Sequence, residues 1–174
     1  MFKVSWKGRP KPAERPRTRF SKDKKSFYVY NPPSYYLYQQ ELIRFFSSFK
    51  EEPEMIEMFD KKNLVYGLSI KLIFRLKSSG KNLFYGKRPD IDNLYKAVVD
   101  ALFLSDVNQV EDGLLTDKEG NAVFDRKGNQ KIKYRQKIDD SRVIHTEILK
   151  LRVDSAEDEG FTIMIRNVGK EDIE

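Results

Sequence analysis

The sequence predicts an α+β domain with one main β-sheet, because strand-like and helix-like hydrophobic patterns follow one another along the chain. Apolar and polar residues alternate at 2–6 and at 64–76, as they do in half-buried strands. Apolar residues recur at helical spacing at 35–50 and at 93–104. We interpret the 174 residues as a single domain, 1–174, of this class.

The N-terminal segment is predicted to contain a strand and a basic loop. Phe2, Val4 and Trp6 alternate with polar residues and form the expected strand. Residues 8–25 are rich in glycine, proline and arginine, and they are expected to form a loop, with a short strand following at 26–30.

A helix is expected from about residue 35 to residue 50. Ser34 follows two prolines and is its expected N-cap. The apolar stripe of this helix consists of Tyr38, Leu42, Phe45, Phe46 and Phe49. The acidic segment 51–60 is expected to add a helical turn.

The middle of the chain predicts a buried strand followed by a second helix. One face of the strand at 64–76 carries Leu68, Ile70, Leu72, Phe74 and Leu76. The apolar period then becomes helical from Asn93 to Leu104, and either Asp92 or Asn93 is expected to cap this helix.

The last third begins with a polar insertion at 106–137. A small hairpin is expected within it, between Ala122–Phe124 and Lys131–Tyr134. Strands are then expected at 142–153 and 161–165, and the C-terminal end is expected to fray.

Positive charge is concentrated at the N-terminal end of the chain. The chain carries 33 Lys and Arg against 27 Asp and Glu, and residues 1–25 alone carry ten basic and two acidic side chains. Such a segment suits a polyanion, because basic side chains that meet phosphates release condensed counterions. The alternative is a solvated basic surface that keeps the protein soluble.

Composition excludes several classes of protein. The absence of cysteine excludes disulfides, zinc–thiolate sites and thiol nucleophiles. No apolar run approaches the roughly eighteen residues of a membrane helix, and no signal peptide opens the chain. We therefore expect a cytoplasmic protein without a membrane partner, either bacterial or a phage product in its host. The single histidine, His145, lies in a strand pattern and is interpreted as structural.

The densest chemistry lies between Asp90 and Asp100. Asp90 and Asp92 are two residues apart, so an extended segment would project both carboxylates to one side. Lys96 and Asp100 are four apart and share one face of the helix that follows. Neighbouring carboxylates repel unless a proton or a cation joins them, and Mg²⁺ prefers such hard oxygen ligands. The alternative is that Asp92 only caps the helix and Asp90 lies in a loop.

A second acidic pair, Asp139–Asp140, comes at the start of the strand at 142–153. This strand edge, if it lies beside the first pair, supplies a third metal ligand. The alternative is an ordinary solvated turn.

Together these motifs resemble the RusA family of crossover-junction endodeoxyribonucleases. The core of that family reads Pro-Asp-x-Asp-Asn-Leu-x-Lys, then Asp-Ala-Leu, then Asp-Asp-Ser-x-Val. Residues 89–96 match the first element, 100–102 the second and 139–143 the third. The basic opening at 8–17 is also similar. The likeness spans roughly residues 4–153, interrupted by 106–137.

The resemblance implies a single mixed β-sheet flanked by helices, with the hairpin inserted at 106–137. It also implies a homodimer that depends on Mg²⁺, or on Mn²⁺ as a substitute, and that resolves four-way (Holliday) junctions by paired nicks. Asp90, Asp92 and Asp140 would be catalytic and bind the metal, and Lys96 would be the accompanying catalytic lysine. Asp100 and Asp139 are secondary candidates.

The sequence departs from the family pattern at the insertion, which separates Asp-Ala-Leu from Asp-Asp. Glu111–Asp112 lies nearer the usual distance and is a rival for the third acidic position. We favour Asp139–Asp140, because the residues after that pair match the family and those after Asp112 do not.

We expect phosphate contacts from a basic set in the N-terminal segment, namely Arg9, Lys11, Arg15, Arg17 and Arg19. Tyr28 and Tyr30 are near enough in sequence to stack on unpaired bases, although ordinary strand packing is the alternative.

Other readings of the function stay open. The junction resolvase is expected to act in recombination, repair or phage DNA processing. The chain is alternatively a catalytically silent protein that binds branched DNA. A general or RNA-directed nuclease is a further reading. An Asp-x-Asp nucleotide-sugar transferase fits less well, because a chain of this length lacks an obvious nucleotide-binding unit.

Overall fold

The computed structural model of the chain describes every residue except 22, 24, 31, 65, 173 and 174. Its centre is a four-stranded sheet in the order β1-β8-β4-β7. The strands are β1 (Phe2–Lys7), β4 (Leu68–Lys77), β7 (Val143–Val153) and β8 (Gly160–Asn167). β4 runs parallel to β7, whereas β8 is antiparallel to both β1 and β4. The predicted α+β class with one mixed sheet is confirmed.

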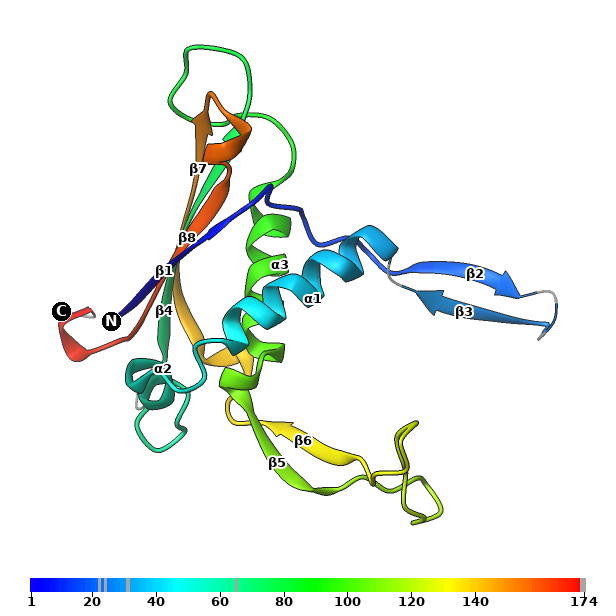
Figure 1. The fold of residues 1–174 in the computed structure, drawn as a ribbon. Helices are drawn as coiled ribbons and strands as arrows, with labels where there is room; N and C mark the ends of the chain where they lie inside the picture. The colour runs from blue at the N-terminus through cyan, green and yellow to red at the C-terminus, as the bar shows by residue number, and fades with distance from the viewer. Residues whose placement is uncertain (22, 24, 31, 65, 173–174) are drawn as a thin grey trace.

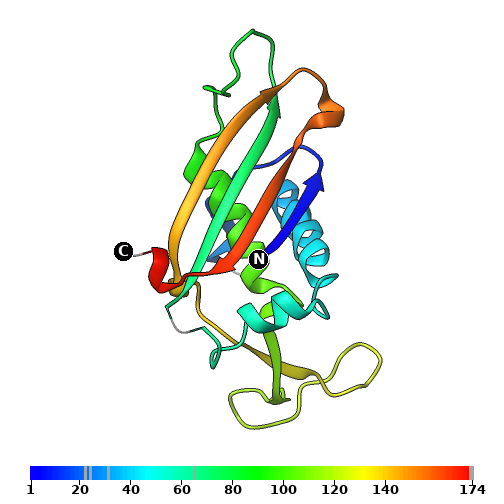
Figure 2. The ribbon, with the colours of Figure 1, turned by 90° about the vertical axis from the view of Figure 1, so that its left-hand side faces the viewer.

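Helices cover one face of this sheet. Figure 2 looks onto the sheet, with α1 (Pro33–Ser47) and α3 (Ile91–Leu104) behind it. The short helix α2 (Pro53–Met58) lies at one end of the sheet and occupies part of the acidic segment expected to be helical (Figure 1). Among the described residues, no helix is long and apolar enough to cross a bilayer.

Aromatic side chains fill the core between the helices and the sheet. Phe161 on β8 is fully buried and stacks on Trp6, with ring centroids 5.4 Å apart. The rings of Phe46 and Phe74 lie 6.4 and 6.1 Å from it, from α1 and β4. The alternating apolar residues predicted for β4 are buried as expected, and so are Tyr38, Leu42 and Phe46 of the helical stripe.

The parallel pairing of β4 and β7 gives α3 its position. Parallel neighbours need a long crossover connection, usually a helix. The chain leaves β4, crosses the sheet as α3, and returns as β7 after the insertion. α3 packs on α1 and on the sheet through its apolar stripe, so the opposite face of α3 is free to carry polar groups.

Both helices begin earlier than predicted. α1 starts at Pro33 after an N-cap at Pro32, so Ser34 lies inside the helix and is not its cap. Proline suits the first helical position, because its fixed φ matches the helix and its missing N–H is not needed there. α3 starts at Ile91 after an N-cap at Asp90, so the expectation that Asp92 or Asn93 caps it is wrong.

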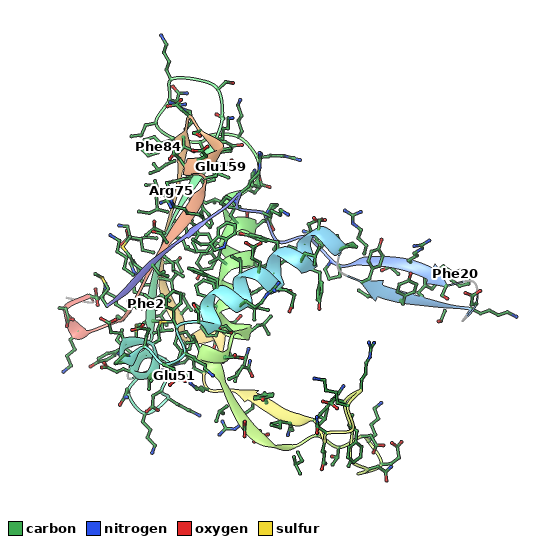
Figure 3. The ribbon with its side chains drawn as sticks, in the orientation of Figure 1. Phe2, Phe20, Glu51, Arg75, Phe84 and Glu159 are labelled. Carbon is green, nitrogen blue, oxygen red and sulfur yellow. The ribbon has the colours of Figure 1, made fainter. Side chains whose placement is uncertain are left out.

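Part of the predicted N-terminal loop is a strand. β2 (Arg17–Ser21) pairs antiparallel with β3 (Ser26–Tyr30), which confirms the strand expected at 26–30. The hairpin projects from the body of the molecule, with Phe20 near its far end (Figures 1 and 3). The sequence pattern did not predict β2, because neither face of this strand is buried. A strand without a buried face shows no alternation of apolar and polar residues.

The insertion is a second projecting hairpin, longer than predicted, and the main partner of its last strand is 109–114 rather than the expected Ala122–Phe124. β5 (Gln109–Leu114) pairs with β6 (Ile132–Gln136), and single bridges continue the arm at Thr116–Ala122 and Phe124–Gln130. Two turns of the same kind, Asp117–Asn121 and Asp125–Asn129, complete it. In each turn the Asp Oδ1 accepts hydrogen bonds from two backbone N–H groups, and the glycine has a φ of 88° or 83°.

The C-terminal residues that the structure describes are held against the sheet rather than frayed. Lys170–Asp172 form a 3₁₀ turn, and Arg166 Nη1 on β8 donates to Asp172 Oδ2 at 2.7 Å. The prediction of fraying is therefore wrong up to Asp172, and residues 173–174 lie outside the described part.

Candidate active site

The outward face of α3 carries the charged residues of the motif. Asp92, Lys96 and Asp100 follow one another at intervals of four, so they lie along one side of the helix. Asp92 and Lys96 are exposed and Asp100 is half-buried. The opposite side, including Leu94, Val98 and Leu102, is completely buried. Burial of the apolar stripe therefore fixes the direction in which this charged row points.

Asp140 is brought to this row by the short 3₁₀ helix η2 (Asp140–Arg142), which leads into β7. Asp139 caps η2, and its Oδ1 accepts a hydrogen bond from the Ser141 N–H at 3.0 Å. Arg142 Nη2 donates to the carbonyl of Leu64 at 2.8 Å and ties η2 to the segment before β4. Two local anchors thus hold the backbone that carries Asp140.

Asp100 and Asp140 line the same two hollows. One, of about 320 Å³, is also lined by Tyr95, Lys96, Val99 and Val143. The other, of about 210 Å³, is also lined by Phe103, Leu104 and Gln136. The two carboxylates, separated in sequence by the whole insertion, therefore meet at one place with Lys96 beside them.

The electrostatics of the site agree with this proximity. Burial raises the pKa of Asp100; the Lys96 ammonium opposes that rise, and the Asp140 carboxylate adds to it. Burial and the nearby Asp140 also raise the pKa of the Tyr95 hydroxyl to about 12. Asp140 therefore interacts with two groups on α3, and a cation placed between the carboxylates would relieve their repulsion.

Asp90 and Asp92 lie at the N-terminal end of the same helix. Asp90 occupies the N-cap position with extended backbone, and Asp92 lies in the first helical turn. The prediction that both project from one extended segment is wrong, because the helix begins between them. The chain before Asp90 is held on β7 by Lys150, whose Nζ donates to the carbonyls of Lys87 and Pro89, each at 2.8 Å.

A divalent metal fits the donors that the structure does bring together. Within the described residues, no three carboxylate or imidazole side chains lie close enough to form a metal-binding group. Mg²⁺, however, commonly uses one or two carboxylates and completes its shell with waters and a substrate phosphate. Asp100 and Asp140 provide such a pair of hard oxygen donors. The assignment of Asp90 and Asp92 as ligands stays a prediction.

The basic N-terminal segment passes directly beside α3. The Ala13 N–H donates to the carbonyl of Asn93 at 2.8 Å, and Lys11 Nζ lies 5.8 Å from the ring centroid of Tyr38. Burial raises the pKa of Tyr35, and the carboxylates of Asp100 and Glu14 raise it further. The segment therefore runs close to the candidate site.

The cations expected to contact DNA are all exposed on this segment: Arg9, Lys11, Arg15, Arg17 and Arg19. Arg17 is paired with Glu14 at 3.1 Å. Tyr28 is exposed on the β2–β3 hairpin, where its ring lies 6.0 Å from that of the half-buried Tyr30. Tyr28 therefore has an open side on which a base can stack.

The model of the family Endodeoxyribonuclease RusA matches residues 7–135. The chain belongs to the RusA family. Members of this family are crossover-junction endodeoxyribonucleases, so the protein is placed among structure-specific DNA nucleases. A comparison with curated proteins gave no match.

The RusA match includes Asp90, Asp92, Lys96 and Asp100 but ends before Asp139–Asp140. Geometry is therefore the evidence that bears on the third acidic position. The rival Asp112 lies on the projecting arm and is engaged by Lys133 Nζ at 2.8 Å and Arg135 Nε at 3.3 Å. Asp140, in contrast, faces the RusA motif on α3. The choice of Asp140 over Glu111–Asp112 as the third acidic residue stays a prediction.

Two residues beside the RusA motif escaped the sequence analysis. Tyr95 occupies the variable position before Lys96 and lines the hollow shared by the carboxylates. Gln136, the last residue of β6, lines the second hollow. Tyr95 lies three residues after Asp92 and four before Val99, so helical spacing could have predicted that it shares their side of α3. No pattern in the sequence predicts that Gln136 lies beside Asp100 and Asp140. His145 lies apart from this site, with its Nδ1 hydrogen-bonded to Ser69 Oγ at 2.8 Å.

Proposed function

We propose that the protein resolves four-way DNA junctions by Mg²⁺-dependent paired nicks and acts as a homodimer. The observation that carries this proposal is the meeting of Asp100, Asp140 and Lys96 in a chain of the RusA family. Two nicks placed symmetrically across a junction need two equivalent active sites, and a twofold homodimer provides them.

In this proposal the lysine and the carboxylates of the site have different roles. The Lys96 ammonium neutralises charge that develops on the phosphate oxygens in the transition state. Asp100 and Asp140 would hold the metal, and Asp90 and Asp92 are predicted to take part from the start of α3. When bound there, Mg²⁺ supplies Lewis-acid stabilisation of the phosphate and lowers the pKa of water. The half-buried position of Asp100 limits the water that competes for these interactions.

The test is cleavage of a synthetic four-way junction labelled on each strand in turn. We expect nicks at symmetric positions in two opposing strands with Mg²⁺ or Mn²⁺, and none with a chelator. Linear duplex of the same length and a matched RNA hairpin serve as substrate controls. Tight junction binding without any nicks in Mg²⁺ would contradict the proposed activity and favour the silent DNA-binding protein instead. Equal cleavage of all substrates would contradict junction specificity.

Replacing Arg15 and Arg19 with alanine is expected to weaken junction binding broadly, because each exposed cation releases counterions when it meets a phosphate. The plot of log K against log salt should lose roughly two units of slope. Fluorescence anisotropy over a salt series measures this change. The matched control is a double variant at Lys3 and Lys170, two exposed lysines that are not among the cations expected to contact DNA. An equal change in the control would show that net charge, and not the cations between Arg9 and Arg19, sets the slope.

A further inference from the structure

A basic groove lies between the turn that follows α2 and the end of β6. Both elements lie at the same end of the molecule as the root of the inserted arm (Figures 1 and 2). The groove has a volume of about 660 Å³ and is lined by four cations, Lys61, Lys62, Arg135 and Lys137. A smaller hollow of about 280 Å³ continues it, shares Lys61 and Lys137, and adds Arg142.

The carboxylates that line these hollows are already engaged in turns. Asp60 Oδ1 accepts a hydrogen bond from the Lys62 N–H at 2.9 Å. Asp139 Oδ1 accepts one from the Ser141 N–H at 3.0 Å. The two hollows are lined by five cations and two carboxylates, so positive charge stays in excess even though Arg135 also pairs with Asp112. The buried side chains of Phe59, Leu64 and Ile138 form part of its lining and strengthen the field by excluding water.

Two of the cations are fixed in place by the inserted arm. Lys137 Nζ donates to the carbonyl of Val107 at 2.7 Å, and Arg135 Nε lies 3.3 Å from Asp112 Oδ1. Lys61 and Lys62 are exposed on the opposite wall. The groove thus has one wall fixed by the insertion and one wall that carries two exposed lysines.

The groove and the candidate active site lie on opposite sides of one backbone segment, residues 136–140. Consecutive residues of an extended strand point to opposite sides, and here Gln136 faces Asp100 and Asp140 while Lys137 faces the groove. Likewise, Asp140 lines the active-site hollow and Asp139 lines the smaller basic hollow. A DNA strand that passes from the site around this segment would therefore reach the groove.

We propose that this groove binds the phosphate backbone of the DNA arm that leaves the active site, with the insertion supplying one wall. The inference rests on the proposed function, because it takes DNA as the substrate. Lysines suit this task, since they bind phosphates as mobile point charges without reading base sequence. The groove positions an arm of the junction and does not take part in the chemical step.

The first test removes the two exposed lysines of the groove, Lys61 and Lys62. The double variant Lys61→Ala/Lys62→Ala is expected to lower junction affinity about tenfold near physiological salt and to reduce the salt slope by roughly two units. Its nicking rate at saturating DNA should stay within about twofold of wild type. The matched control is Lys3→Ala/Lys170→Ala, which removes the same charge elsewhere on the surface. An unchanged slope, or an equal loss in the control, would overturn the proposal.

A second test uses the absence of cysteine from the chain. Lys62→Cys creates a single thiol that can exchange with a mixed disulfide tethered to one DNA phosphate at a time, which joins protein to DNA and releases the small leaving thiol. Cross-linking is expected at phosphates of one arm, a few nucleotides from the nick, and not with Lys170→Cys. Cross-links scattered evenly over all arms, or none, would overturn the groove assignment and leave another ligand, such as an acidic protein segment, as its occupant.

These experiments separate failure of the proposed junction cleavage from failure of the groove to bind DNA. If the wild type binds junctions but never nicks them, the proposed function fails, while the slope and the cross-link still test the groove. If the wild type nicks junctions and neither the lysine variant nor the cross-link shows a contact, the groove alone is refuted.

Discussion

Replacing Asp140 with asparagine is expected to lower the rate of junction nicking by roughly a thousandfold, while junction affinity stays within a few-fold of wild type. Asparagine keeps the size of the side chain but removes the charge that would hold a divalent ion beside Asp100 and Lys96. A metal contributes several kcal/mol to stabilising the transition state, and about 4 kcal/mol corresponds to a thousandfold in rate. Single-turnover nicking of a labelled junction measures the effect.

Matched changes to the rival acidic pair make this prediction specific. Asp112→Asn and Glu111→Gln are expected to change the nicking rate less than about threefold, because Asp112 is engaged by Lys133 and Arg135 on the arm. Asp90→Asn and Asp92→Asn test the ligands predicted from the motif in the same assay. Loss of activity in Asp112→Asn with retention in Asp140→Asn would reverse the assignment of the third acidic position.

Replacing Asn108 with alanine is expected to destabilise the fold by about 2–4 kcal/mol. Asn108 is completely buried where the insertion begins. Its Nδ2 donates to the carbonyls of Phe103 and Ile138 at 3.1 and 3.0 Å, and its Oδ1 accepts from the Ile138 N–H at 3.0 Å. Alanine leaves these buried backbone groups without their partner. Urea unfolding monitored by circular dichroism measures the loss.

The same substitution is expected to reduce nicking even in the folded fraction. Asn108 joins the end of α3 to the strand that leads into Asp139–Asp140, so its loss frees the backbone that positions Asp140. Asn121→Ala, in an exposed turn of the arm, is the matched control and should cost less than about 0.5 kcal/mol. Destabilisation by Asn108→Ala of under 1 kcal/mol would show that water replaces the lost hydrogen bonds.

The regular elements of the fold were predictable because their apolar period is set by burial. β4 alternates along its length, since one face meets α1 and α3, and the stripe of α3 repeats at helical spacing for the same reason. β2 gave no such signal, because both of its faces are exposed in the projecting hairpin. Patterns of hydrophobicity therefore revealed the core, whereas they predicted only one strand of the first arm, at 26–30, and part of the inserted hairpin.

The chemistry of the candidate site was likewise only partly determined by sequence. The residue types and their order established the RusA resemblance, and helical spacing alone placed Lys96 and Asp100 on one face of α3. Tertiary structure decided which carboxylate meets them: Asp140 arrives from beyond the insertion because β7 pairs in parallel with β4 beside α3. In the structure α3 begins at Ile91, two residues earlier than predicted. Asp90 therefore occupies the N-cap position of the helix, while Asp92 lies in its first turn. Local periodicity reports what each segment buries, whereas contacts between distant segments depend on how the strands pair.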